Sequence, residues 1–265
     1  MDKTEKWIPN NGSSTFDKII RDDQEFKILP LTHKKTVFDA IPILETGTIQ
    51  PHECEVFNHK LIYLFYGIPS YDIAQDIGSR KDSSYCPICF LLKHNNIKIS
   101  NAFPFDTGAF KKNKYKKYMN DHMDLYDFAL KTNIEYVNHF VSTFYNSNKD
   151  YYIWNPKKNL DELDYSYLFD FHIDSYIRMI TKNEETEIDS RAHTIEIICE
   201  NKIILSDSLL AIIAPHDYCE KKLIKEKYSN VDIIGYHTFY QDPPSSYNSV
   251  IKELVYNYLL SKKLL

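Results

Sequence analysis

The chain has 265 residues, 43% of them hydrophobic and 14% aromatic, which is enough to bury the core of one large domain or two small ones. Its 32 basic and 37 acidic residues give a net charge of −5, so no overall basic field favours sequence-independent binding to nucleic acid, although a local basic patch is compatible with this balance. The beginning of the chain lacks the apolar core of a signal peptide, and no apolar run is long enough to span a bilayer. Together with five cysteines, an odd number, these features predict a cytoplasmic protein with reduced thiols and no membrane partner.

The first part of the chain alternates polar segments with short apolar runs. Residues 1–24 are polar and predict a flexible N-terminal arm around Trp7 and Phe16. A short helix is expected over 36–41, because Pro42 and Gly47 follow it. Strands are predicted over 26–31, 61–66, 85–93 and 97–100.

The middle of the chain differs in character, because helical spacing and aromatic residues dominate it from about 111 to 185. After it, helices are predicted over 216–228 and from the Ser245–Ser246 pair to Leu260, with either serine as N-cap. Strands are predicted over 192–199, 203–205, 209–214 and 231–239. The expected architecture is therefore a single α+β domain over 25–265 with a helical insertion at 111–185.

Glu196 is the most informative single residue, because it lies within a run that otherwise has the pattern of a buried strand. Burying an ionised carboxylate costs several kcal/mol unless the group is paired or hydrogen-bonded, so such a residue indicates a site. Strand alternation places Thr194 and Glu196 on one face, with Arg191 nearby. The alternative is an edge strand with one face in water, where a glutamate needs no explanation.

A second constellation precedes it in the chain. Thr32 and His33 are assigned to the end of a first strand, a helix then ends at residues 43–47, and the apolar strand 61–66 follows. This arrangement resembles the amino-terminal half of small NAD-using ADP-ribosyltransferases, which include bacterial toxins that modify DNA and the tRNA 2′-phosphotransferases. The resemblance covers roughly residues 26–71 and 186–240. It implies a mixed or antiparallel split sheet, NAD as substrate, and no metal.

The resemblance also implies roles for particular residues. In the family, a histidine two residues before the threonine contacts the nicotinamide-side ribose, but Pro30 stands at that position here, which leaves His33 as the substitute. A tyrosine stacks on the nicotinamide, and a glutamate on a later strand, matched here by Glu196, supports catalysis. The candidates for the stacking ring are Tyr63, Tyr66 and Tyr71.

A single carboxylate suits this chemistry, because cleavage of the nicotinamide–ribose bond leaves positive charge on the ribose and nicotinamide departs without needing a proton. Glu196, Tyr66 and Thr32 are the predicted catalytic residues. The transferase hypothesis built on these residues requires the side chains of Glu196, Thr32 and Tyr66 to share one cleft, and it fails if they do not. The residues predicted to contact NAD are Thr32, His33, Tyr63, Tyr71, Arg80, Arg191 and Thr194, with the two arginines as phosphate ligands or, alternatively, as members of structural salt bridges.

Three other features have both a functional and a structural interpretation. Asp106 either contacts the substrate or caps a turn between aromatic residues. Cys86 and Cys89 have the spacing of half a zinc site, with His216 and Cys219 as the only comparable pair, but they fit buried thiols better. The run 111–118 interleaves lysine with tyrosine, which is typical of nucleic-acid grooves and also of a solvated helix face.

The leading hypothesis is an ADP-ribosyltransferase-like protein that cleaves NAD and transfers ADP-ribose to a macromolecule, with nucleic acid as one candidate acceptor. The family type suggests a bacterial toxin or an anti-phage defence effector, with an antitoxin or another defence component as partner. The first alternative is a catalytically inactive module of the same fold that binds a nucleotide or nucleic acid, which Pro30 favours. A metal-dependent nuclease or hydrolase is the second, although no suitably spaced carboxylate pair supports it.

Overall fold

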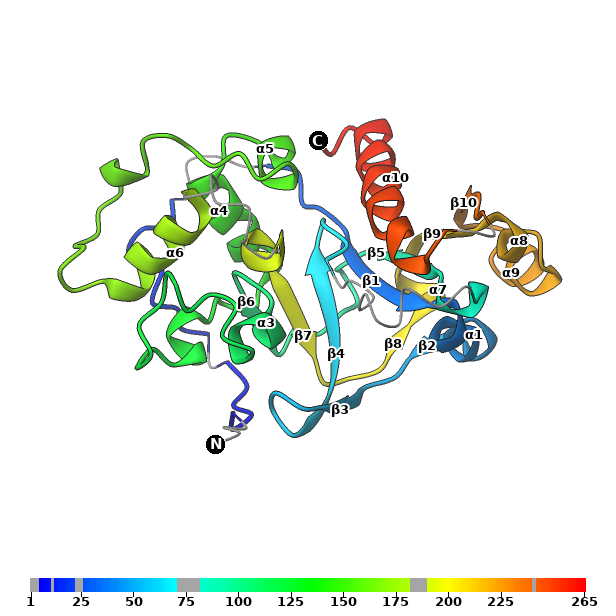
Figure 1. Ribbon diagram of the computed structural model, residues 1–265, viewed down its shortest axis with the longest axis horizontal. Helices are drawn as coiled ribbons and strands as arrows, with labels where there is room; N and C mark the ends of the chain where they lie inside the picture. The colour runs from blue at the N-terminus through cyan, green and yellow to red at the C-terminus, as the bar shows by residue number, and fades with distance from the viewer. Residues whose placement is uncertain (1–4, 11, 22–25, 71–81, 182–189, 240–241) are drawn as a thin grey trace.

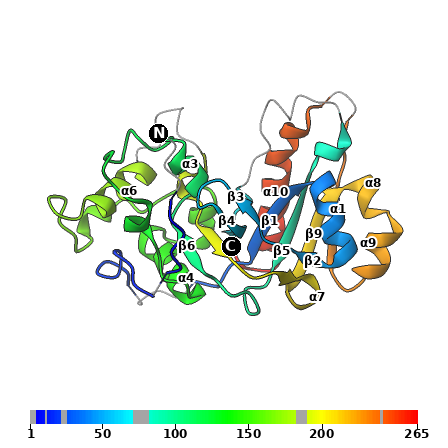
Figure 2. The same ribbon diagram turned by 90° about the horizontal axis from the view of Figure 1, so that it is seen from below.

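The computed structural model describes residues 5–10, 12–21, 26–70, 82–181, 190–239 and 242–265. Figures 1 and 2 show a central sheet with helices gathered toward both ends of the molecule. The strands are β1 Leu31–Thr36, β2 Thr48–Ile49, β3 His52–Cys54, β4 His59–Tyr66, β5 Pro87–Leu92, β6 Asn101–Phe103, β7 Glu196–Cys199, β8 Ile203–Ile204, β9 Leu209–Pro215 and β10 Asp232–Tyr236.

The main sheet has eight strands in the order β10-β9-β5-β1-β4-β7-β6, with β3 paired to β4 beside this path. Its neighbours are antiparallel except for the parallel pair β9 and β10. A second sheet consists of β2 and β8. The predicted α+β class with a mixed, mostly antiparallel sheet is therefore confirmed.

Strands β1 and β4 part soon after they meet. Their register contains only the pairs Leu31–Tyr66 and Thr32–Phe65, although both strands continue in the direction away from these pairs. Beyond that point β1 pairs along its whole length with β5, whereas β4 pairs with β3 and β7. Figure 1 shows the two strands diverging, so that β1 and β4 belong to two parts of one continuous sheet.

Helices near the chain ends pack around the β1–β5–β9 part of the sheet. Helix α1 begins at the Thr36 N-cap, whose hydroxyl accepts from the amide of Asp39, and it ends at Gly47 in the left-handed conformation. Helix α10 packs on β5 and β9. The helices of this group are α1 Val37–Thr46, α7 Leu205–Ser208, α8 His216–Cys219, α9 Lys222–Lys227 and α10 Tyr247–Ser261, with the 3₁₀ turns η1 Ser83–Tyr85 and η5 Pro244–Ser246.

The other helices lie between β6 and β7 in the chain and gather beyond the β6 edge (Figure 1). They are α3 Thr107–Lys111, α4 Ile134–Phe144, α5 Asn148–Tyr152 and α6 Phe171–Thr181, with the 3₁₀ turns η2 Leu125–Phe128, η3 Leu160–Glu162 and η4 Ser190–His193. None of the helices in the described ranges combines the length and the apolar character needed to cross a membrane.

The described part of the N-terminal segment is held against this helical end. Phe16 is completely buried, and its ring meets those of Phe140, Phe144 and Tyr176. The indole of Trp7 donates a hydrogen bond to Glu200, and its ring packs on Phe57 and His59.

Several boundaries differ from those predicted. The first strand is five residues later than expected, because Pro30 has no N–H to donate and ladder pairing starts after it. The predicted strand 192–199 is a strand only from Glu196, since 190–193 form a 3₁₀ turn in which the amide and the hydroxyl of Thr194 both donate to the carbonyl of Arg191. The fourth predicted strand lies at 101–103 instead of 97–100, and the helix expected over 216–228 is divided into α8 and α9.

Candidate active site

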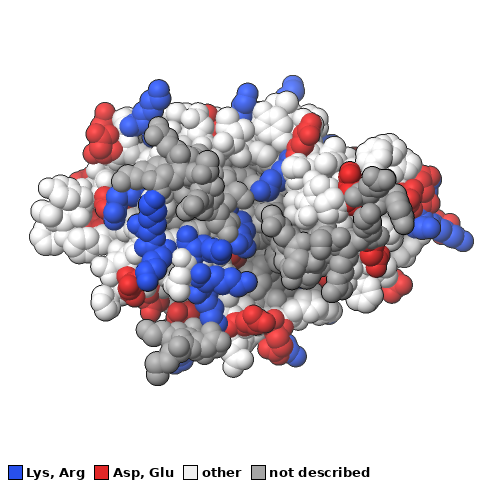
Figure 3. All heavy atoms as spheres, in the orientation of Figure 1, with Lys and Arg blue, Asp and Glu red and all other residues white. Residues whose placement is uncertain are grey.

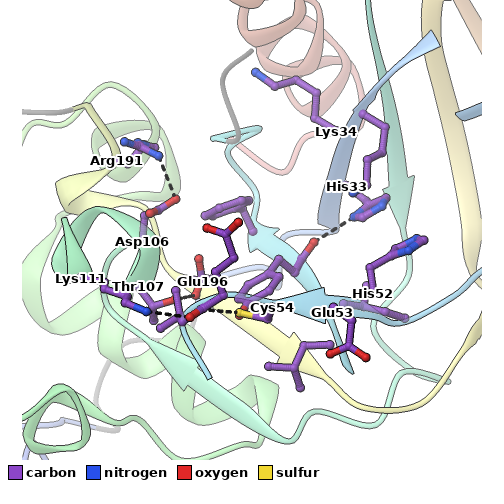
Figure 4. A pocket seen from close by; sticks show the side chains of 18 of the residues that line it. His33, Lys34, His52, Glu53, Cys54, Asp106, Thr107, Lys111, Arg191 and Glu196 are labelled. Carbon is purple, nitrogen blue, oxygen red and sulfur yellow. Dashed lines mark hydrogen bonds and ion pairs between the residues drawn. The ribbon is translucent and has the colours of Figure 1, made fainter. Parts of the chain in front are cut away.

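A cleft of about 800 Å³ occupies the space where β1 and β4 diverge. Its walls come from β1, β3 and β4, from α3 with the residues at both of its ends, from Arg191 in η4, and from Glu196 at the start of β7. Figure 4 shows Asp106, Thr107 and Glu196 on the α3 side of this space and His33 on the β1 side. Residues from five separate segments of the chain thus meet in one cavity.

Glu196 is the buried carboxyl group of the cleft. Its strand lies between β4 and β6, and the residue is only 3% exposed, so the alternative of a solvated edge strand is wrong. The hydroxyl of Thr107 donates to Oε1 at 2.6 Å. Burial, and secondarily the charge of Asp106, raises the pKa of Glu196 well above its usual value, while Thr107 and Arg191 act in the opposite direction. Glu196 therefore holds a proton at a higher pH than an exposed glutamate.

Asp106 combines the two roles that its sequence context left open. It is the N-cap of α3, where Oδ1 accepts from the amide of Ala109 at 2.6 Å. Its other oxygen, Oδ2, forms an ion pair with Nη1 of Arg191 at 3.4 Å, and both residues line the cleft. Because the Arg191 guanidinium is engaged by Asp106, its position gives less support to the predicted role as a phosphate ligand.

His33 lines the cleft from the β1 side, directly after the last residue of β1 that pairs with β4. Its Nδ1 lies 2.9 Å from the carbonyl oxygen of Tyr63, which can only accept, so Nδ1 carries the proton. Burial, aided by the charge of Lys35, lowers the pKa of His33 to about 3, and the ring is neutral. The remaining nitrogen, Nε2, is buried, has no hydrogen-bond partner among the described residues, and presents a lone pair.

Tyr63 supplies an aromatic surface in the same cleft. Its ring is half-buried, and its hydroxyl is hydrogen-bonded to Sγ of Cys54 on β3. Burial is the largest cause that raises the pKa of the Tyr63 phenol, with the charge of Glu196 next, so the hydroxyl stays protonated. Phe65 lies two residues further along the same face of β4.

Thr32, Tyr66 and Thr194 do not line the cleft. The Thr32 hydroxyl is buried and donates to the carbonyls of Phe65 and Ile68, which stabilises the end of β4. The Tyr66 hydroxyl accepts from the amide of Leu29 and donates to Asn138 within the core. Thr194 is hydrogen-bonded to Ser70, and it precedes the strand, so it does not share a face with Glu196.

The requirement that Glu196, Thr32 and Tyr66 share one cleft is therefore not met, and the transferase hypothesis in the form that relies on Thr32 and Tyr66 fails. Two further predicted ligands of NAD, Tyr71 and Arg80, lie outside the described residues. The predicted residues that the structure does bring together are His33, Tyr63, Asp106, Arg191 and Glu196.

Other residues of the cleft were missed from the sequence. Thr107 directly follows Asp106, and its hydrogen bond to Glu196 depends on a contact between residues 89 positions apart. Lys35 lies two residues after His33 on β1 and therefore shares its face of the strand, so the position of His33 would have indicated it. The remaining lysines of the lining are Lys34, Lys111 and Lys112.

The cysteines have structural environments. All five are buried free thiols, and burial raises the pKa of Cys89 to about 12. Sγ of Cys219 donates to the carbonyl of Ala214. Within the described ranges no group of three or more His, Cys, Asp or Glu residues is placed to hold a metal ion.

Comparisons of the chain with protein-family models, with curated proteins and with solved structures find no match.

Proposed function

We propose that this cleft binds NAD and that the protein is an ADP-ribosyltransferase-like enzyme, with His33, Tyr63 and Glu196 as its central residues in place of the Thr32–Tyr66–Glu196 set. The observation that carries the proposal is the meeting of a buried carboxyl group, a neutral imidazole with an unpartnered nitrogen, and an aromatic ring in one cleft. These three side chains match the types that the resembling family uses for ribose, nicotinamide and catalysis.

Each group has a role that its environment supports. The lone pair of His33 Nε2 accepts a hydrogen bond from a ribose hydroxyl, because the Tyr63 carbonyl fixes the proton on Nδ1. The ring of Tyr63 offers a face on which the nicotinamide stacks. Glu196 in its ionised form stabilises the positive charge that develops on the ribose.

In the proposed reaction the bond between the nicotinamide nitrogen and the ribose carbon breaks, and neutral nicotinamide leaves with the bonding electron pair. A nucleophile on the acceptor, or water, then forms a bond to the same carbon and loses its proton. A second carboxylate beside the first is consistent with this chemistry, since glycoside-cleaving sites use carboxyl pairs whose pKa values are driven apart. Asp106, held by Arg191, is that neighbour.

The test is the release of nicotinamide from NAD, together with calorimetric binding of NAD, for the wild type and for Glu196→Gln. The variant keeps the shape and the hydrogen bond from Thr107 but cannot ionise, so we expect binding within a few-fold of wild type and a loss of cleavage of at least about 10²-fold. Glu226→Gln on α9 makes the same change on an exposed residue outside the cleft and serves as the matched control. Wild-type protein that does not bind NAD would contradict the proposal.

A non-catalytic nucleotide-binding module is the second candidate. It is favoured by the raised pKa of Glu196, since a protonated carboxyl group can hydrogen-bond a nucleotide without stabilising a cation. This candidate predicts that NAD binds to the wild type and remains uncleaved at every pH, including alkaline pH where Glu196 ionises.

A further inference from the structure

We propose that the acceptor is a nucleic acid, held through its phosphodiester backbone by the basic segment, residues 111–118, which borders the cleft. This inference rests on the function proposed above and names the second substrate of the same site. The basic segment contains five lysines, Lys111, Lys112, Lys114, Lys116 and Lys117, and no acidic residue occurs from Gly108 to Asn120. In a chain with net charge −5, this is a strong local concentration of positive charge.

The tyrosines of the basic segment determine how these lysines are presented. Tyr115 is 1% exposed and Tyr118 is 7% exposed, and the ring of Tyr115 packs against Phe105 at 5.3 Å. With both rings anchored in the core, Lys112, Lys114, Lys116 and Lys117 lie exposed on a succession of turns. Figure 3 shows lysine and arginine side chains gathered on this face, over the region where Figure 1 labels α3 and β6.

The basic segment is continuous with the candidate active site. It begins at the end of α3, whose first residue Thr107 donates to Glu196. Lys111 and Lys112 line the cleft itself, and Nζ of Lys111 donates to the carbonyl of Glu55, directly after β3, at 2.7 Å. A polyanion that follows the lysines therefore arrives at the mouth of the cleft that contains the proposed catalytic carboxyl group.

The composition of the exposed surface favours nucleic acid over a protein acceptor. Protein partners bind mainly through buried aromatic and apolar anchors, whereas the exposed side chains of the basic segment are lysines and Asn113. Repeated lysines suit the repeated charges of a phosphodiester chain. The ion pair of Lys116 with Asp121, at 3.8 Å between exposed groups, is too weak to remove this charge. Because Tyr115 and Tyr118 are buried, their rings do not stack on bases, and we expect contacts that are independent of base sequence.

The experiment measures binding without NAD, by fluorescence anisotropy, to labelled single-stranded DNA, duplex DNA and single-stranded RNA over a series of salt concentrations. With about four phosphate contacts, the wild-type affinity is expected to fall roughly 50- to 150-fold between about 50 and about 200 mM salt. The variant with Lys112, Lys114, Lys116 and Lys117 changed to Gln is expected to lose most of this binding and most of the salt dependence. The three probes show whether DNA or RNA is preferred.

The matched control changes four exposed lysines that do not line the cleft, Lys93, Lys149, Lys158 and Lys202, to Gln, and so alters the net charge equally. Equal binding by the two fourfold variants, or no binding of any probe by the wild type, overturns the acceptor assignment. Thermal unfolding verifies that each variant is folded, and if the first is not, the pair Lys114→Gln and Lys117→Gln is measured instead. Release of nicotinamide by the wild type in water is assayed separately, so failure of the acceptor assignment is distinguished from failure of NAD cleavage.

Discussion

Burial of Glu196 has opposite consequences for catalysis and for stability. Its pKa in the folded protein is raised above the usual value of 4.5, so between these two pKa values the folded state binds one more proton than the unfolded state. The contribution of Glu196 to the free energy of unfolding is therefore fully present below about pH 4.5, and it is lost as the pH rises through the folded-state pKa. Ionised Glu196 destabilises the fold at the pH where the proposed chemistry needs it.

We predict that Glu196→Gln stabilises the protein at alkaline pH by on the order of 1 to 3 kcal/mol, because glutamine remains neutral in the same environment. The gain should vanish below about pH 4.5, where the wild-type carboxyl group is protonated in both states. Denaturant unfolding at a series of pH values measures it, with Glu226→Gln as the control. An equal stability difference at all pH values would contradict the assignment of a buried, raised-pKa group.

His33 gives a second prediction at this scale. Because burial lowers its pKa to about 3, the ring is expected to stay neutral, with the proton on Nδ1, down to about pH 4. The ¹⁵N chemical shifts of the imidazole nitrogens report this state directly. The pH dependence of NAD binding by the wild type should then contain no step near pH 6.5 that is due to His33. His33→Gln, which lacks the Nε2 acceptor, should bind NAD about 10-fold more weakly. A protonation step of His33 near pH 6.5 would contradict a ring that stays neutral down to about pH 4.

Between elements, the first turn of α3 and the chain before β7 are joined by the Asp106–Arg191 pair beside Glu196. The negative charge of Asp106 is the second cause of the raised Glu196 pKa, and Arg191 opposes it. Asp106→Asn removes that charge but retains a side-chain oxygen that can cap α3. We predict that the acid limb of the pH profile for NAD cleavage moves to lower pH in this variant, whatever happens to the maximum rate.

The control is the pH profile of Thr32→Ser, a variant outside the cleft. Its acid limb is not expected to shift, because the Thr32 hydroxyl donates to the backbone carbonyls of Phe65 and Ile68. A limb that does not move in Asp106→Asn, or that moves to higher pH, would show that Asp106 does not control the ionisation of Glu196.

The elements that could be predicted are those with strong local signals. Strand β4 and helix α10 lie close to their predicted ranges, and helix α4 lies within the segment 111–185 for which helical spacing was predicted, because apolar periodicity over 8 to 15 residues determines these elements. Glu196 was found as a site residue because a carboxylate is unusual in an apolar strand. Thr107 was missed because its contact with Glu196 joins residues 89 positions apart, whereas Lys35 was missed although it shares the face of His33 on β1. Tyr66 was overvalued because an aromatic residue at a strand end has no local sign of burial.

At the level of the whole molecule, the N-terminal segment connects regions that lie far apart in the sequence. Its Trp7 bonds to Glu200 after β7, Ser14 donates to the carbonyl of Ala129, and Phe16 enters the aromatic cluster of α4 and α6. The helical end of the molecule therefore includes residues from the beginning of the chain in its core.

We predict that Phe16→Ala lowers the free energy of unfolding by about 3 to 5 kcal/mol, because it removes a fully buried ring and leaves a cavity among Phe140, Phe144 and Tyr176. Ile8→Ala is the matched control in the same segment, since Ile8 is 50% exposed and should change stability by less than about 0.5 kcal/mol. Denaturant unfolding measures both. If Phe16→Ala lowered the free energy of unfolding as little as Ile8→Ala, the segment would be dispensable for the fold. A large loss of stability with NAD binding retained at low temperature would show that the segment stabilises the fold without contributing to the cleft.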